Sequence, residues 1–122
     1  MNSSPEPLCD APHTEQRETR KPSVDAEVID RAADLFAALG DPPRLRLLAL
    51  LAQGPACVSD LAANEGQGMA AISQRLKFLR SASLVRRQRQ GKHVMYSLAD
   101  KHVVDLVSNV LAHAGEGTSK VS

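Results

Sequence analysis

The fold of this chain is decided by residues 58–98, which read VSDLAANEGQGMAAISQRLKFLRSASLVRRQRQGKHVMYSL. Apolar side chains recur at helical intervals over residues 58–64 and again over residues 69–82, and this pattern predicts two helices. The sequence EGQG at residues 65–68 provides a tight turn between them. Two helices joined in this way are typical of a helix-turn-helix.

The remainder of this stretch alternates between apolar and polar residues in the manner of paired strands. Residues 84–89 and 94–98 are the two alternating runs, and Gln90-Gly91-Lys92 between them has the composition of a hairpin turn. A helix-turn-helix followed by a β-hairpin is the arrangement of a winged helix-turn-helix.

Further helices are expected on both sides of this stretch. Residues 23–39 and 42–53 carry apolar side chains at helical spacing, and Asp41 is placed to cap the second of these helices. A last helix begins at Asp100 and fades near residues 115–117, where two glycines occur. The expected fold class is therefore mainly α with a small β-hairpin.

The 122 residues are expected to form one domain with a modest core. Residues 1–22 are rich in Pro, Ser, Thr and charge, so they predict a flexible N-terminal arm. Residues 23–116 are expected to form the DNA-binding and dimerisation domain, a homodimer through its N- and C-terminal helices. Residues 117–122 are expected to be a disordered tail.

Several classes of protein are disfavoured by the composition. No apolar run approaches the roughly 18 residues of a membrane span, and the N-terminus lacks the pattern of a signal peptide. These features predict a cytoplasmic protein with no membrane partner. The only cysteines, Cys9 and Cys57, are too few for a disulfide framework, so both are expected to be thiols that are available as ligands.

The stretch between Gly66 and Ala99 is strongly basic, although the net charge of the whole chain is only +1. It holds no Asp or Glu and seven basic residues, which are Arg75, Lys77, Arg80, Arg86, Arg87, Arg89 and Lys92. A charge run of this kind is most often a solvated face. Here it coincides with the second helix of a helix-turn-helix and with its hairpin, the elements that meet DNA in this architecture. We therefore predict that the stretch binds double-stranded DNA.

The predicted DNA contacts fall into two groups. Outward side chains at the start of the second helix are expected to reach base edges, and these are Ser73, Gln74 and Arg75, with Lys77 on the same exposed side. Side chains of the hairpin are better placed for phosphates, and these are Arg86, Arg87, Arg89 and Lys92. Arg80 is not assigned as a contact, because it could cover apolar surface or pair with an acid.

The last predicted helix carries four metal-ligating side chains, namely Asp100, His102, His113 and Glu116. The histidines lie eleven residues apart, so they project from nearly the same face but are separated by about 16 Å along the helix. Two antiparallel copies of the helix would bring the Asp100/His102 end of one beside the His113/Glu116 end of the other. A two-fold axis would generate this site twice. Two imidazoles and two carboxylates suit tetrahedral zinc (Zn²⁺), and cadmium or cobalt could take its place.

Four segments resemble the ArsR/SmtB-type repressors. They are LGDPPRLRLL at 39–48, CVSDLA at 57–62, ISQRLKFL at 72–79 and QGKHVMYSL at 90–98. The resemblance covers about residues 24–116. It implies a homodimeric repressor that binds a palindromic operator when it is metal-free, releases the operator on binding metal, and controls genes of metal efflux or sequestration.

The resemblance also implies two metal sites, and this chain matches the zinc-sensing SmtB-like branch at both. The C-terminal helix of that branch carries D-x-H and H-x-x-E with the spacing found at Asp100, His102, His113 and Glu116. Its second site joins a C-x-x-D to an N-terminal C-x-x-x-H of the other subunit, and the matching residues are Cys57, Asp60, Cys9 and His13.

This chain departs from the family pattern at the turn of the helix-turn-helix. The family has apolar residues at 65 and 67 and Ser or Thr at 68, where this chain has Glu65, Gln67 and Gly68. Glu65 is expected to bring a negative charge near the DNA-facing turn, and Gly68 is a weaker cap than Ser. Gln74 stands where many relatives carry His.

Two other functions compete with a zinc-responsive repressor. The first is a winged-helix regulator that senses thiol redox state or another soft metal through Cys9 and Cys57. The second is a zinc-buffering protein without DNA function. An enzyme is not expected, because a metal with four protein ligands has no open position for water and no nucleophile–base pair is evident. No small organic substrate is indicated.

Overall fold

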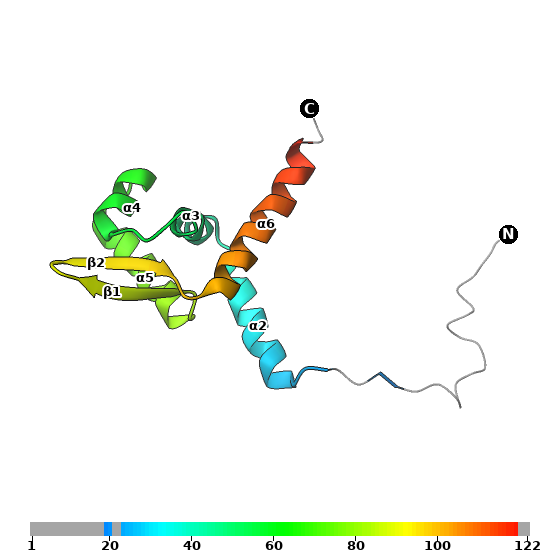
Figure 1. The fold of residues 1–122 in the computed structure, drawn as a ribbon. Coiled ribbons are helices and arrows are strands. Elements are labelled where there is room, and N and C mark those ends of the chain that lie inside the picture. Colours follow the sequence, from blue (N-terminus) through cyan, green and yellow to red (C-terminus); the bar gives the residue numbers. More distant parts are fainter. Residues whose placement is uncertain (1–18, 21–22, 120–122) are drawn as a thin grey trace.

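The computed structural model describes residues 19–20 and 23–119, so most of the predicted arm at residues 1–22 lies outside the described part. The described elements, in chain order, are α2 (Ala26–Leu39), α3 (Pro42–Leu51), α4 (Val58–Glu65), α5 (Met69–Ser81), β1 (Val85–Gln90), β2 (His93–Leu98) and α6 (Lys101–Ser119). This order confirms the expected fold class, mainly α with a two-stranded hairpin (Figure 1). None of the described helices is both long enough and apolar enough to cross a membrane.

The core is aliphatic and draws on nearly every element. Its largest fully buried side chains are Leu47, Leu48, Leu61, Ile72, Leu76, Leu79, Leu84 and Val107. They come from α3, α4, α5, the α5–β1 junction and α6, so one shared core fixes the hairpin and both ends of the helix-turn-helix relative to each other. A core of leucine and valine agrees with a chain in which only 2% of residues are aromatic.

The turn between α4 and α5 depends on a glycine in a left-handed conformation. Gly66 follows α4 with φ 63°, and the Gln67 amide behind it donates to the Ala62 carbonyl at 3.1 Å. Glycine adopts this conformation at no steric cost, whereas residues with a Cβ are strained there. Gly68 then occupies the N-cap position of α5 and supplies no side-chain hydrogen bond, as predicted.

The hairpin turn is tighter than the sequence predicts. Gln90 pairs with His93, so only Gly91 and Lys92 remain in the turn. Gly91 has φ 63°, the positive value that the first position of a type II′ turn requires. Two backbone hydrogen bonds between Ala56 and Tyr96, at 2.8 and 2.9 Å, attach the hairpin to the loop before α4.

The ends of the outer helices differ from the prediction. α2 begins at Ala26 rather than near residue 23, and its N-cap, Asp25, makes no side-chain capping hydrogen bond. α6 continues to Ser119, so the predicted boundary at residue 116 falls inside the helix. Each glycine costs about 1 kcal/mol in a helix, but an established helix gains one hydrogen bond with each added residue.

Candidate nucleic-acid interface and metal half-sites

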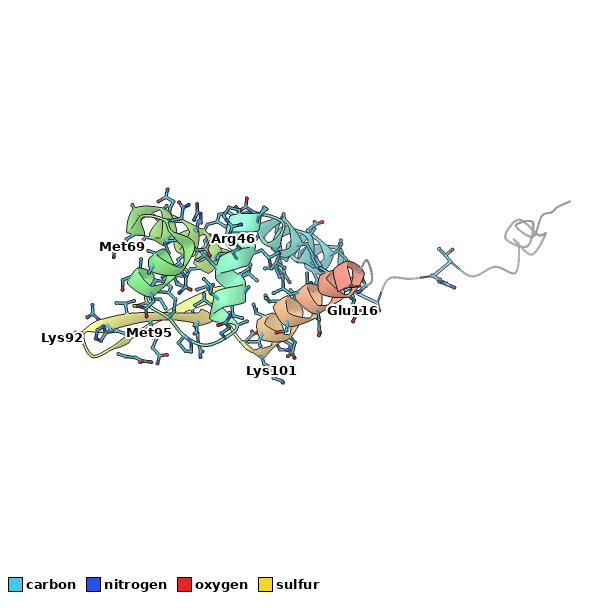
Figure 2. All side chains as sticks on the ribbon, turned by 90° about the horizontal axis from the view of Figure 1, so that it is seen from above. Arg46, Met69, Lys92, Met95, Lys101 and Glu116 are labelled. Atoms are coloured by element: carbon cyan, nitrogen blue, oxygen red, sulfur yellow. The ribbon has the colours of Figure 1, made fainter. Side chains whose placement is uncertain are left out.

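Most of the predicted DNA contacts are exposed on α5 and the hairpin. The exposed ones are Ser73, Gln74, Lys77, Arg86, Arg87, Arg89 and Lys92. Lys92 lies at the tip of the hairpin, which points away from α6 (Figure 2). The Arg86 Nε donates to the Ser97 hydroxyl across the strands at 3.3 Å, which holds that guanidinium against the hairpin.

Arg75 differs from the outward position that the sequence predicts. Its side chain is half-buried, and its Nη1 atom is buried without a hydrogen-bond partner. The reason is helical geometry, since Arg75 lies three residues after Ile72 and four before Leu79, and both of those are fully buried. Arg75 therefore lies at the edge of the core face of α5, and Ser73 and Gln74 are the better exposed candidates for reading bases.

The negative charge of Glu65 is paired, which the sequence did not indicate. The Arg46 Nε donates to Glu65 Oε1 at 2.8 Å, and the Glu65 side chain is only 11% exposed. The acid therefore links α3 to the end of α4 and does not stand as a free charge beside the DNA-facing turn. Arg46 was missed because it lies 19 residues from Glu65 and no local pattern joins them.

The first pair of predicted metal ligands lies together at the start of α6. Asp100 Oδ1 is 3.5 Å from His102 Nδ1, and the same oxygen accepts a hydrogen bond from the Val103 amide at 3.1 Å. This N-cap geometry lets Asp100 share a side with His102, although residues two apart within a helix point away from each other. The His102 side chain is 97% exposed, so its ring is accessible to a second chain.

The second predicted pair lies near the other end of the same helix. His113 and Glu116 are one turn apart and both are exposed. Figure 2 labels Lys101 and Glu116, which mark the two ends of α6 where the pairs lie. In the part of a single chain that the structure describes, no three His, Cys, Asp or Glu side chains gather closely enough to hold a metal. Each chain thus offers two separated pairs, and each pair has the nitrogen and oxygen donors that fit zinc.

Only half of the second predicted metal site lies within the described residues. Cys57 is the N-cap residue of α4, is half-buried, and has its Sγ 3.2 Å from the Ser59 hydroxyl. Asp60 is exposed in the first turn of the same helix. The other two predicted ligands, Cys9 and His13, lie outside the described residues.

The outer helices α2 and α6 expose large apolar side chains. The set comprises Val28, Ile29 and Phe36 on α2, Val110 and Leu111 on α6, and Val24 just before α2. Figure 1 shows both helices on the side of the molecule opposite the hairpin tip. Large apolar side chains left exposed on two neighbouring helices indicate a protein interface.

Comparisons with known proteins agree on one family. Residues 41–87 match the family model described as bacterial regulatory protein, arsR family. The chain is 42% identical over 113 residues to the transcriptional repressor SmtB homolog of Synechocystis sp., covering 90% of this chain and 86% of that protein. It is 34% identical over 88 residues to the cadmium resistance transcriptional regulatory protein CadC homolog of Staphylococcus aureus, covering 71% and 73%.

A solved structure resembles this fold as well. The homodimeric winged helix-turn-helix DNA-binding domain from Mycobacterium bovis, a possible ArsR-family regulator, superimposes with a TM-score of 0.71 at 31% identity. The match covers 81% of this chain and 92% of that one. The winged helix-turn-helix that the sequence predicts is therefore confirmed.

Proposed function

The chain belongs to the arsR family of bacterial regulatory proteins, and from that premise we propose that it is a zinc-responsive repressor that acts as a homodimer. Proteins of this family are DNA-binding repressors and not enzymes. Zinc-free dimers bind a palindromic operator in the cytoplasm, and zinc-bound dimers release it. The genes controlled are those of metal efflux or sequestration.

The observation that carries the proposal is the position of the two ligand pairs on α6. Asp100 and His102 are in contact at one end, and His113 and Glu116 are exposed near the other. In an antiparallel pair of α6 helices, the first pair of each chain lies beside the second pair of the other. When bound, zinc supplies four bonds that hold the two α6 helices in one relative orientation.

The dimer itself is supported by the apolar surface of the outer helices. A free monomer would leave Val28, Ile29 and Phe36 of α2 and Val110 and Leu111 of α6 in water. Burying them against a second copy brings the α6 helices together, and the Mycobacterium bovis domain described above is a homodimer. The interface and the metal ligands thus lie on the same elements.

DNA recognition is assigned to the exposed residues of α5 and the hairpin. Ser73 and Gln74 are placed to read bases, and the hairpin arginines and Lys92 to bind phosphates. The two recognition helices must lie about 34 Å apart to read both half-sites of an operator. Zinc would hold the two α6 helices in a subunit orientation that misses this spacing. The dimer would then lose its contacts with both half-sites and release the operator. Linkage then requires that DNA weaken zinc binding by the same factor.

Zinc is favoured by the donor set rather than by the family. The Staphylococcus aureus relative carries cadmium resistance in its name, so relatives differ in the metal they answer to. Two imidazoles and two carboxylates without a thiolate suit zinc better than a soft ion, and cobalt or cadmium could replace it in vitro. Cys57 and Asp60, completed by Cys9 and His13, would form a second site in which thiolates make cadmium competitive.

Operator titration tests this function. The DNA upstream of the gene is titrated with the wild-type protein and with the double variant His102→Ala/His113→Ala, each with and without zinc. We expect zinc to weaken operator binding by the wild type roughly 5- to 150-fold, the usual range for coupled sites, and to leave the double variant unchanged. Asp105→Asn, which alters an exposed carboxylate of α6 outside the ligand pairs, is the matched control and should respond like the wild type. A double variant that still releases the operator with zinc would exclude α6 as the sensor.

A further inference from the structure

A hollow of about 450 Å³ lies between the recognition helix α5 and the first strand of the hairpin. Its lining comprises Lys77, Arg80, Ser81, Val85, Arg86 and Arg87. Four of these six side chains are cationic and none is acidic. We propose that this hollow binds one phosphodiester group of the operator and that Arg80, which the sequence pattern left unassigned, is one of its ligands. This inference rests on the proposed function as a DNA-binding repressor.

The cations of the hollow have no acidic partner among residues 19–20 and 23–119. The ion pairs among the described residues involve Arg44, Arg46, Lys101 and His102, and none involves a residue of the hollow. Arg80 therefore pairs with no acid of the described part of the chain, and such a pair was one of its two alternative roles. Four like charges around one hollow repel each other, and an anion bound between them would relieve that repulsion.

The other polar group in the lining is already engaged. The Ser81 hydroxyl donates to the Phe78 carbonyl at 2.7 Å, so its proton is not available to a ligand. Arg86 uses its Nε on the Ser97 hydroxyl, which leaves its terminal nitrogens available for an anion. Donors to the ligand are thus cationic, and arginine and lysine together are the side chains that proteins use for phosphate.

The place of the hollow on α5 connects it to the DNA-reading surface. Ser73, Lys77 and Arg80 are spaced by four and then three residues, so they form one row along α5, and the last two of them line the hollow beside β1. The row begins at a residue assigned to base reading and ends in the hollow. A DNA strand whose bases meet Ser73 therefore continues past Lys77 and Arg80.

The ligand is a phosphate carried by DNA rather than a free anion. The four cations are exposed to solvent, where a single ion pair contributes little. A phosphodiester is held at the hollow by all the other contacts of the operator, so it does not have to bind alone. Neutralising a phosphate also releases counterions, which makes the contribution visible in the salt dependence of binding.

The test measures operator affinity of the zinc-free protein across a range of salt concentrations. Arg80→Ala should reduce the slope of log K against log[salt] by about one and weaken specific and non-specific DNA alike. Arg80→Lys keeps the charge and should retain most of the slope. Arg20→Ala is the matched control, because it removes the same charge from an exposed residue outside the described helices and strands, and it should leave the slope unchanged.

The outcomes separate this inference from the proposed function. A wild type that binds and releases its operator as proposed, with an Arg80→Ala variant whose slope equals that of the wild type, overturns the phosphate site alone. A wild type that does not bind its upstream DNA overturns both. Binding of inorganic phosphate to the DNA-free protein, lost in Arg80→Ala, would show a free-anion site and overturn the assignment to DNA.

Discussion

The two ends of the molecule differ in whether a single chain supplies all the residues that each end needs for its proposed role. The reading unit, formed by α4, α5, β1 and β2, packs on a core that is complete in a single copy, with its turn and its charged surface in place. The outer helices, α2 and α6, expose apolar side chains and carry ligands only as separated pairs. A unit that reads DNA can therefore be rigid in each subunit, while the metal site that we propose on α6 needs a second copy to be completed.

The largest expected effect contrasts the buried core around α5 with the exposed apolar side chains of α6. Leu76→Ala removes a fully buried side chain from α5 and should lower the free energy of unfolding by about 2–5 kcal/mol at any protein concentration. Val110→Ala removes an exposed side chain of α6 and should instead shift the dimer–monomer equilibrium. Urea unfolding at several protein concentrations separates the two. A Leu76→Ala variant as stable as the wild type would contradict a core that is complete within one chain.

The second expected effect concerns the turn inside the reading unit. Gly66→Ala should cost about 1–2 kcal/mol, because φ is 63° and a Cβ is strained there although nothing lies within 4 Å of it. Gly68→Ala is the matched control, since that position also has open space around its Cβ but a negative φ, and it should cost less than Gly66→Ala, because alanine is only a poorer N-cap there and is not strained. Thermal unfolding of both variants measures the difference, and equal losses would argue against a left-handed Gly66.

The third effect separates the two roles of Asp100 at the start of α6. Asp100→Ala removes the cap of the Val103 amide and should destabilise the protein by roughly 0.5–2 kcal/mol as well as weaken zinc binding. Asp100→Asn can still cap, so it should keep the stability and lose only zinc affinity. Calorimetry with zinc and urea unfolding report the two properties. If both variants bind zinc as the wild type does, Asp100 is a cap and not a ligand.

The smallest effect is expected at the Arg46–Glu65 pair, which joins α3 to the reading unit. Glu65→Gln removes the charge but keeps a hydrogen-bond acceptor for Arg46, and it should cost less than about 1 kcal/mol because Arg46 is largely exposed. Operator affinity should be nearly unchanged, since the charge is already paired. A large gain in affinity for DNA would indicate that Glu65 repels the operator as an unpaired acid.

The sequence predicted best what depends on local spacing. The helix-turn-helix, the hairpin and the capping role of Asp41 follow from periodicity, glycines and cap chemistry, and the structure confirms them. Prediction from the sequence failed where burial is decided by packing. Arg75 looked outward by its place near the start of α5 but lies at the core edge, and Arg46 meets Glu65 only through the tertiary fold.

The sequence and the structure of one chain give the two proposed ligand pairs of α6, but they do not give a complete four-ligand site. Helical rise separates Asp100/His102 from His113/Glu116 by three turns in any single helix, so one chain can show only the halves. Their joining depends on the second copy.

Mixed dimers test the central claim most directly. In His102→Ala or His113→Ala homodimers, each shared site lacks one ligand. A dimer of one His102→Ala chain and one His113→Ala chain has one site missing both histidines and one site fully intact. Purified mixed dimers, with Cys57→Ser in every chain to remove the second proposed site, should therefore regain one tight zinc ion per dimer, measured by titration against a chelator, while neither homodimer binds zinc tightly. Mixed dimers that bind zinc no better than the two homodimers would contradict a site shared between the α6 helices of two subunits.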